Sequence, residues 1–262
     1  MSPRRGAAAG ARRRARVSPR PSSPDSPRIR RATLTTQLEE ALRTDIVSGL
    51  FEPRQKLRAD DIASRYGVSA TPIREAFQRL SGDGLVELDP KIGARVAGIS
   101  LDDIRDVFAV RLALEPRALA LSIMKGDAAW LREVATAFER LRAVASIRLP
   151  SDDARRREAM LETAEAHRAF HWALLAACGS PWLLRFISIL HGHSSRYRML
   201  LVRGLDQPGW LDDHEAILRA ARRQDADRAV RMLERQTRDG LAVLVRTYGA
   251  SLRGRRSQRP TD

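Results

Sequence analysis

The stretch that decides the fold of the first domain is Leu57–Val96, LRADDIASRYGVSATPIREAFQRLSGDGLVELDPKIGARV. Its segment Ala59–Tyr66 carries two acidic residues in the first turn and is followed by Gly67, which is the pattern of a short helix ending at a glycine. Ser69 stands at an N-cap position before a second apolar-periodic segment, Thr71–Asp83. The spacing therefore predicts two short helices joined by a tight turn.

The sequence on either side of these helices completes a small domain. Thr33–Gly49 has leucine and isoleucine at helical spacing and predicts an amphipathic helix, and Phe51–Leu57 reads as extended. After the second short helix, Leu85–Leu88 and Ala94–Ala97 are short apolar runs separated by turn residues, which predicts a two-stranded hairpin. Three helices and a hairpin within residues 33–100 form a winged helix-turn-helix, an architecture that inserts its second motif helix into the major groove of DNA.

Arg74 is the best candidate for a base contact in this domain. It lies one turn into the second motif helix, on the side away from Ile73 and Phe77, so its guanidinium is able to reach a guanine or a phosphate. A single exposed arginine is usually only a solvated charge, so the inference depends on the order of the whole motif. The DNA-binding candidates are Arg58, Arg65, Ser69, Thr71, Arg74, Lys91, Gly93 and Arg95.

The sequence from Ser100 onward predicts an all-helical domain, residues 101–249, with almost no strand signal. Cap residues and glycine or proline breaks separate the candidate helices. These are Leu101–Lys125, Ala128–Ser146, Asp152–Cys178, Pro181–Leu205, Gly209–Arg223 and Ala226–Tyr248. The predicted fold class is mainly α, with an N-terminal winged helix-turn-helix and a C-terminal all-α bundle.

The charge of the chain indicates a polyanionic partner. Lysine and arginine total 47 against 32 acidic residues, a formal net charge of +15. The surplus is concentrated in residues 1–32, which predicts a disordered Arg-rich arm, and residues 250–262 predict a disordered basic tail. The single cysteine, Cys178, fits a reducing cytoplasm, and no apolar stretch approaches the ~18 residues that span a bilayer. We therefore expect a soluble cytoplasmic protein without membrane contact.

Histidines in the helical domain are candidates for metal binding. His167 and His171 are four residues apart, so both imidazoles project from one face of a helix, and His214 must come from another helix. The pattern is equally compatible with a metal site and with a polar pocket lining. His191 and His193, two residues apart, diverge on a helix and are expected to be ordinary helix residues. The tryptophans Trp172 and Trp182 are expected in the core or on a dimer face.

The winged-helix stretch resembles the signature of the GntR family of bacterial transcriptional regulators. The tract GVSATPIREAFQRL, residues 67–80, together with GDGLVEL, residues 82–88, matches that family at many positions with the same spacing. One departure is Ala70, which stands where the family commonly has arginine. The operator preferences of relatives that carry this arginine are therefore not transferred.

The helical half resembles the effector domain of the FadR subfamily, known as the FCD type, with six or seven helices. The resemblance rests on VFAVRLALEPRALALS, HRAFHWALLAACGSPWL and DDHEAILRAARRQDADRAVRML. It implies a pocket for a small carboxylate, with a metal held by one Asp and three His. His171 and His214 fall on histidine positions of that pattern, His167 on the Asp position and Gln236 on the last histidine position. A Zn²⁺ or Ni²⁺ ion per subunit is one possibility, and direct binding of the acid by His and Arg is the other.

An anionic effector requires cationic groups in the pocket. Arg111, one turn before Glu115, is a candidate, because guanidinium binds carboxylate in a bidentate manner. In HSSRYRML, either Arg196 or Arg198 could point inward, and the effector-binding candidates are Arg111, Arg196 and Tyr197. The same words resemble the carbon-starvation-induced, glutarate-responsive branch, which implies a short dicarboxylate.

These features together predict a homodimeric repressor that leaves its DNA operator when a small carboxylate binds, and not an enzyme. Two alternatives stay open. A metal-dependent enzyme would use the His167, His171 and His214 cluster, but HRAFH lacks the general-base glutamate of HExxH. A nonspecific nucleic-acid-binding protein would depend mainly on the Arg-rich arm.

Overall fold

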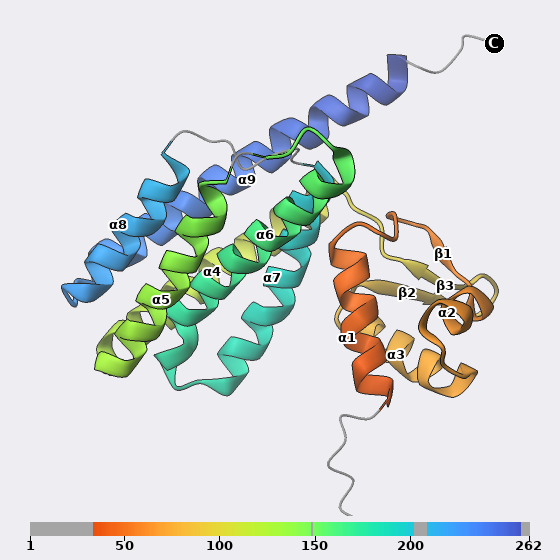
Figure 1. Ribbon diagram of the computed structural model, residues 1–262, viewed down its shortest axis with the longest axis horizontal. Helices are drawn as coiled ribbons and strands as arrows, with labels where there is room; N and C mark the ends of the chain where they lie inside the picture. Colours follow the sequence, from red (N-terminus) through yellow and green to blue (C-terminus); the bar gives the residue numbers. More distant parts are fainter. Residues whose placement is uncertain (1–33, 148, 202–208, 258–262) are drawn as a thin grey trace, which may run out of the picture. The chain divides into compact units, whose positions relative to one another are not determined.

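The computed structural model describes residues 34–147, 149–201 and 209–257 (Figure 1). The Arg-rich arm predicted for residues 1–32 and the last residues of the basic tail lie outside this part. The described chain is mainly helical, with a small sheet near its N-terminal end, as the sequence predicts.

The N-terminal domain consists of three helices and a three-stranded antiparallel sheet. Its elements are α1 Leu34–Val47, β1 Lys56–Leu57, α2 Ala59–Tyr66, α3 Ala70–Gly82, β2 Val86–Asp89 and β3 Gly93–Val96. The strand order is β1-β3-β2, and Arg95 of β3 pairs with Lys56 on one side and Glu87 on the other. The sequence predicted only the two strands of the hairpin, and the structure adds β1 as a third. This strand was not predicted because it is too short to show the alternation that identifies a strand.

One hydrophobic core holds this domain together. Leu42 and Ile46 of α1 and Ile73 and Leu80 of α3 are fully buried in it. Ser69 occupies the N-cap position of α3 with extended backbone, as expected, but its side chain makes no capping hydrogen bond. The apolar spacing that predicted the helices is therefore the spacing of their buried faces.

The C-terminal domain is a helical bundle. Its elements are α4 Leu101–Lys125, α5 Ala128–Ala145, α6 Asp153–Leu175, the short 3-10 turn η1 Ala176–Cys178, α7 Pro181–Leu201, α8 Trp210–Arg222 and α9 Ala226–Ser257. Ser100 and Asp127 cap α4 and α5 by accepting hydrogen bonds from Asp103 N and Trp130 N. Helix α9 does not end at Tyr248, as the sequence predicted, but continues to Ser257.

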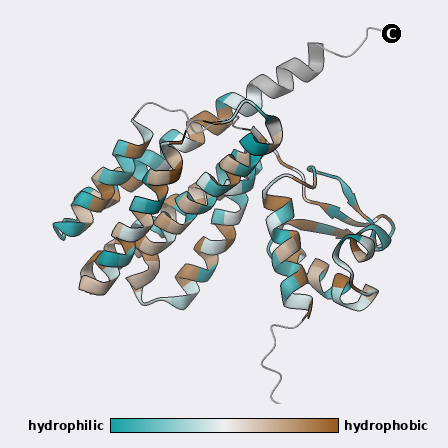
Figure 2. Cartoon of the chain, in the orientation of Figure 1, coloured by the Kyte–Doolittle hydropathy of each residue, from teal (hydrophilic) through white to brown (hydrophobic). Residues whose placement is uncertain are grey.

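The bundle has its own core, in which Leu119, Phe170 and Leu233 from three different helices are buried. Figure 2 shows hydrophobic and hydrophilic segments alternating along these helices, as helices packed on one side require. Of the two locations expected for Trp182, the core is excluded, because this side chain is 67% exposed and stacks on Phe186, which is 52% exposed. No helix in the described ranges is long and apolar enough to cross a membrane.

Candidate functional site

The outer face of α3 presents the residues expected to contact DNA. Ser69, Thr71 and Arg74 are exposed, whereas Ile73 and Phe77 on the opposite side are buried in the domain core. Because the Ser69 hydroxyl is not used as a cap, it is free to bond an external group. The N-terminal turn of this helix therefore offers a guanidinium and two hydroxyls to solvent.

The other DNA-binding candidates divide into free and paired cations. Arg58 and Lys91 are exposed, with no ion pair to any described residue. Arg65 lies 3.6 Å from an Asp45 oxygen, and Arg95 Nη2 lies 2.6 Å from Glu87 Oε2. The two paired arginines are partly neutralised, so the free cations are the stronger phosphate ligands.

The tip of the wing is held in a defined turn. Asp89 accepts hydrogen bonds from the backbone N–H groups of Lys91 at 2.7 Å and Ile92 at 3.0 Å. These two bonds keep the pKa of the Asp89 carboxyl below its usual value. Gly93, exposed at φ 89°, ends the turn in a conformation that favours glycine. The Lys91 side chain is thus carried on a turn that its own backbone helps to fix.

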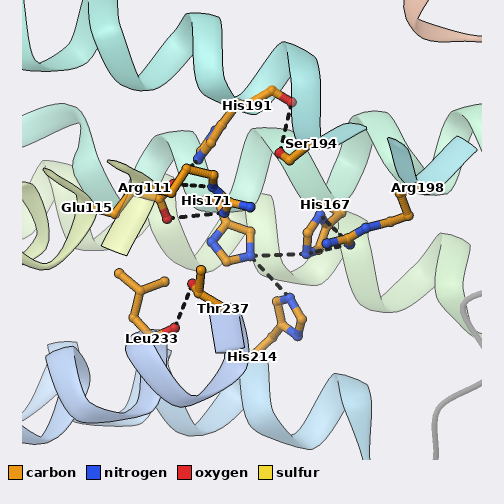
Figure 3. A network of polar contacts seen from close by, with 10 residues as sticks. All are labelled: Arg111, Glu115, His167, His171, His191, Ser194, Arg198, His214, Leu233 and Thr237. Atoms are coloured by element: carbon orange, nitrogen blue, oxygen red, sulfur yellow. Dashed lines mark hydrogen bonds and ion pairs between the residues drawn. The ribbon is translucent and has the colours of Figure 1, made fainter. Parts of the chain in front are cut away.

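Three histidines meet in the helical domain, as Figure 3 shows. His167 and His171 come from α6 and His214 from α8. The His171 Nε2 atom lies 3.1 Å from His167 Nε2 and 3.3 Å from His214 Nε2. The cluster predicted from the sequence is therefore present, with its ring nitrogens converging on one point.

The ring nitrogens that face one another do not carry enough protons to hydrogen-bond all of their neighbours. His214 Nδ1–H donates to the Trp210 carbonyl at 2.7 Å, so its Nε2 carries a lone pair. One proton on His171 Nε2 is able to bond only one of its two neighbours. A metal would use all three lone pairs, and two nitrogens on a tetrahedral zinc, each about 2.0–2.1 Å from the metal, stand about 3.3 Å apart. The two separations from His171 fit that arrangement.

Gln236 of α9 adds a fourth group to the cluster. Its Nε2 lies 2.8 Å from His214 Nδ1 and 3.0 Å from His214 Nε2, and its Oε1 is buried without a hydrogen-bond partner in the described part of the chain. Half a turn of the amide would exchange the two atoms and direct the free oxygen to the histidines. The donor set of three imidazoles and one amide oxygen fits a divalent metal such as Zn²⁺ or Ni²⁺.

All three rings are neutral near pH 7. Burial is the largest cause and lowers the pKa of His214 to about 4. Burial, followed by the positive charge of Arg198, places the pKa of His167 well below its usual value, and burial acts in the same direction on His171. Neutral imidazole is the form that ligates metals, so near pH 7 a metal does not compete with a second proton on any of these rings.

A buried ion pair lies next to the histidines. Arg111 Nε and Nη2 donate to Glu115 Oε1 and Oε2 at 2.6 and 3.2 Å, and His191 Nε2 contacts Glu115 Oε1 at 3.0 Å. Desolvation opposes ionisation of this carboxyl, but the charge of Arg111 and the bonds from both partners hold its pKa far below the usual value. His191 was expected to be an ordinary helix residue, and the structure corrects this by placing it in the network.

These groups line a pocket between α4, α6 and α7. Its charged and imidazole side chains are Arg111, His167, Arg168, His171, His191 and Arg198. Of the arginine alternatives in HSSRYRML, it is Arg198 that faces the pocket. Arg196 instead donates to the Ala97 carbonyl, and the Tyr197 hydroxyl bonds Asp103 at 2.6 Å, so the structure places neither candidate in the pocket lining. Arg111 is placed there as expected.

The two domains match two known families. Residues 34–96 match the bacterial regulatory proteins of the gntR family, and residues 106–238 match the FCD domain. Together the matches cover both the winged helix and the helical bundle.

Curated relatives extend the match over most of the chain. The HTH-type transcriptional regulator BphR of Paraburkholderia xenovorans is 35% identical over 80% of this chain and 84% of its own length. The HTH-type transcriptional repressor GlaR of Escherichia coli is 34% identical over 62% of this chain and 71% of its own length.

Solved structures agree on the fold. Escherichia coli McbR/YncC superposes with a TM-score of 0.70 at 21% identity, over 82% of this chain and 99% of that one. A GntR regulator from Rhodococcus sp. RHA1 gives 0.67 at 22% identity, over 80% and 97%. Members of this family are transcriptional regulators, which confirms the expectation that the chain is not an enzyme. The chain belongs to the GntR family of bacterial transcriptional regulators and carries an FCD effector domain.

Proposed function

We propose that this regulator binds a DNA operator as a homodimeric repressor and leaves it when a small carboxylate enters the pocket of the helical domain. The observation that carries the proposal is the pocket itself, which combines three guanidinium groups with neutral imidazoles and has no acidic residue in its described lining. An anion is the ligand such a lining favours. A short dicarboxylate is the proposed class, in keeping with the resemblance of the α6 and α7 sequences.

DNA recognition is assigned to the outer face of α3 and the wing. Arg74 is proposed to read a base edge, with Ser69 and Thr71 beside it, and Arg58 and Lys91 to bind phosphates. Arg65, Gly93 and Arg95 then serve mainly to position these groups. Two copies of α3 would address half-sites about one helical turn, roughly 34–36 Å, apart.

The metal proposed for the pocket is Zn²⁺ or Ni²⁺, held by the three-histidine cluster and Gln236. When bound, such an ion would supply a positive charge that attracts an acid. The protein contributes the tautomer of His214, which its Trp210 bond fixes, and the burial that keeps the rings neutral.

Dimer formation is supported by exposed aromatic side chains at the start of α7. Trp182 and Phe186 stack with ring centroids 6.1 Å apart and stay mostly exposed. Large exposed aromatic residues are enriched in protein interfaces. We propose that this pair is part of the surface between two copies, and the molar mass in solution of the parent and of Trp182→Ser tests it.

The proposed function is tested by genomic footprinting, followed by release of the recovered operators with a panel of carboxylates and metal analysis of the same protein. We expect discrete palindromic sites and release by at least one short dicarboxylate. Arg74→Ala should lose sequence preference, costing about 1–3 kcal/mol of discrimination at one base pair. Arg79→Ala is the matched control, because Arg79 lies on the same helix but contacts Glu39. Binding without discrete sites, lost when residues 1–32 are removed, would instead support the nonspecific alternative.

A further inference from the structure

Four side chains of the helical domain donate hydrogen bonds to main-chain carbonyls of the winged helix or of the linker that follows it. The donor and acceptor pairs are His193 and Asp83, Arg196 and Ala97, Arg157 and Ser48, and Tyr248 and Ile99. Two of the donors, His193 and Arg196, lie on α7, and neither lines the pocket. Because every acceptor is a main-chain carbonyl, these bonds hold the path of the chain and do not depend on its side chains.

The first of these bonds holds the end of α3, the helix that presents Arg74. His193 Nε2 donates to the carbonyl of Asp83, the C-cap residue of α3, at 2.8 Å. Carbonyls at the C-terminus of a helix have no partner within the helix and carry partial negative charge, so they accept such bonds readily. The next residue is Gly84, at φ 74°, and a Cβ there would lie 3.4 Å from the His193 ring. Helix α7 therefore both bonds and contacts the end of α3.

The linker between β3 and α4 consists of residues 97–100, and side chains of three different elements hold it. Arg196 of α7 bonds its first carbonyl and Tyr248 of α9 bonds its third, at 2.8 Å for the tyrosine. The N–H of its second residue donates to Glu87 Oε1 of the wing at 3.1 Å. A linker of this length without such bonds would reach up to about 13–14 Å and would let the winged helix move. The observed bonds remove this freedom.

Arg196 occupies its place in this arrangement at a cost to stability. Its side chain is fully buried, and its Nε and Nη1 atoms have no hydrogen-bond partner in the described part of the chain. The charges of Asp103 and Glu87 act on it, but each of these acids bonds another residue. Burial lowers the pKa of this guanidinium, and a buried charge without a counter-charge destabilises a fold. The one hydrogen bond that Arg196 makes is to the linker, so its contacts support a role in positioning the linker.

From these contacts we infer that His193 and Arg196 are positioning residues that set the spacing between the two half-sites of the operator. The inference rests on the proposed function, because it requires two copies of the chain on one operator. When each winged helix is fixed on its own helical domain, the two α3 helices stand at one separation, and one half-site spacing fits both. When the winged helix is free to move on its linker, several spacings fit. The bases read within each half-site stay the same, because His193 contacts the C-terminal end of α3 and Arg74 lies near the N-terminal end.

The experiment selects binding sites for the full-length protein from a randomised DNA duplex library, and sequencing gives the half-site sequence and the spacer length separately. We expect the parent to select one dominant spacer length. Fluorescence anisotropy then compares the selected site with versions whose spacer is one base pair longer or shorter. This change shifts a half-site by about 3.4 Å along the duplex, so parent binding should weaken about 10-fold or more, because the second winged helix misses its half-site.

The test variant combines His193→Phe with Arg196→Met, which removes both donors and keeps side chains of similar size. It should select several spacer lengths with an unchanged half-site sequence, and a one-base-pair change should weaken its binding less than about threefold. The combination of His193→Gln with Arg196→Lys keeps a donor at each position and should restore much of the spacing preference. Thermal unfolding verifies that each variant is folded.

Arg105→Met is the matched control, because Arg105 lies in the first turns of α4, close to the linker, but is exposed and pairs with Asp102. It makes the same exchange of arginine for methionine and should keep the single spacer length. Arg74→Ala should have the opposite effect to the test variant, since it loses the half-site sequence but keeps the spacing of whatever sites it binds.

Two results for the test variant would overturn the inference. One is selection of the same single spacer length as the parent, and the other is loss of the half-site sequence together with the spacing, which would mean that these residues support the fold of the winged helix. In the parent, paired half-sites without a preferred spacing would also contradict the inference while the proposed function stands. If the parent selects no discrete site, the proposed function itself fails.

Discussion

Replacing Glu115 by glutamine should destabilise the helical domain strongly. The Glu115 side chain is 1% exposed and that of Arg111 is 7% exposed, so neither charge is screened by solvent. The amide keeps the shape of the carboxyl but leaves the guanidinium buried without a counter-charge. Removing one partner of a buried pair costs about 3–5 kcal/mol, and we expect the lower end, because the amide oxygen still accepts one bond. At about 2–4 °C per kcal/mol this predicts a fall in Tm of roughly 6–12 °C.

Denaturant and thermal unfolding of the metal-free protein measure this change, and a double variant supplies the control. Arg111→Met combined with Glu115→Gln removes both charges, so it should recover at least about half of the loss, since replacing a buried pair by uncharged groups is often nearly neutral. A loss below about 1 kcal/mol in Glu115→Gln alone would refute the claim that this carboxylate holds the buried charge of Arg111 in place.

The pH dependence gives an independent check on the same carboxyl. Its pKa in the folded protein is lowered, so the unfolded chain takes up the proton first as the solution becomes acidic. The stability that Glu115 contributes is therefore complete above its unfolded pKa of about 4.3 and is lost as pH falls below it. The difference in unfolding free energy between parent and Glu115→Gln should accordingly shrink below about pH 4. A difference that grows there would contradict the assigned direction.

Two further substitutions test other parts of the fold. Gly126→Ala would place a Cβ 2.1 Å from Trp130 Cε3, and we expect it to lower the unfolding free energy by about 1–3 kcal/mol. The control is Gly82→Ala, whose Cβ meets nothing within 4 Å and which should change the unfolding free energy little. Similar stabilities of the two variants would refute the clash. Asp89→Ala removes the acceptor of the two wing-tip N–H groups, so the turn that positions Lys91 is no longer fixed. We expect operator affinity, measured by fluorescence anisotropy, to fall several-fold. Stability and sequence preference should change little, because this turn reads no base. An unchanged affinity would mean that the wing does not contact the operator.

The sequence predicts most helices because burial follows their apolar spacing. Ala59–Tyr66 and Leu101–Lys125 are observed with the predicted bounds, since each has acidic residues in its first turn and a glycine directly after it. The strand Lys56–Leu57 could not be predicted, because two residues show no alternation and the strand exists only through its pairing with β3. The sequence left Trp182 between the core and a dimer face for a related reason, since hydrophobicity alone does not distinguish a core residue from one left on the surface.

The pocket shows more clearly where sequence reasoning ends. On α7, His191, Ser194 and Arg198 are spaced by three and four residues and share one face, whereas His193 and Arg196 share another. Each face offers one histidine and one arginine, so polarity could not decide which one lines a pocket. The structure adds an acid 76 residues earlier: Glu115 on α4 contacts His191, and Arg198, on the same face as His191, contacts His167. The α7 face that lines the pocket is therefore marked by a pairing between helices, and we expect a change at Glu115 to alter the carboxylate response of the pocket.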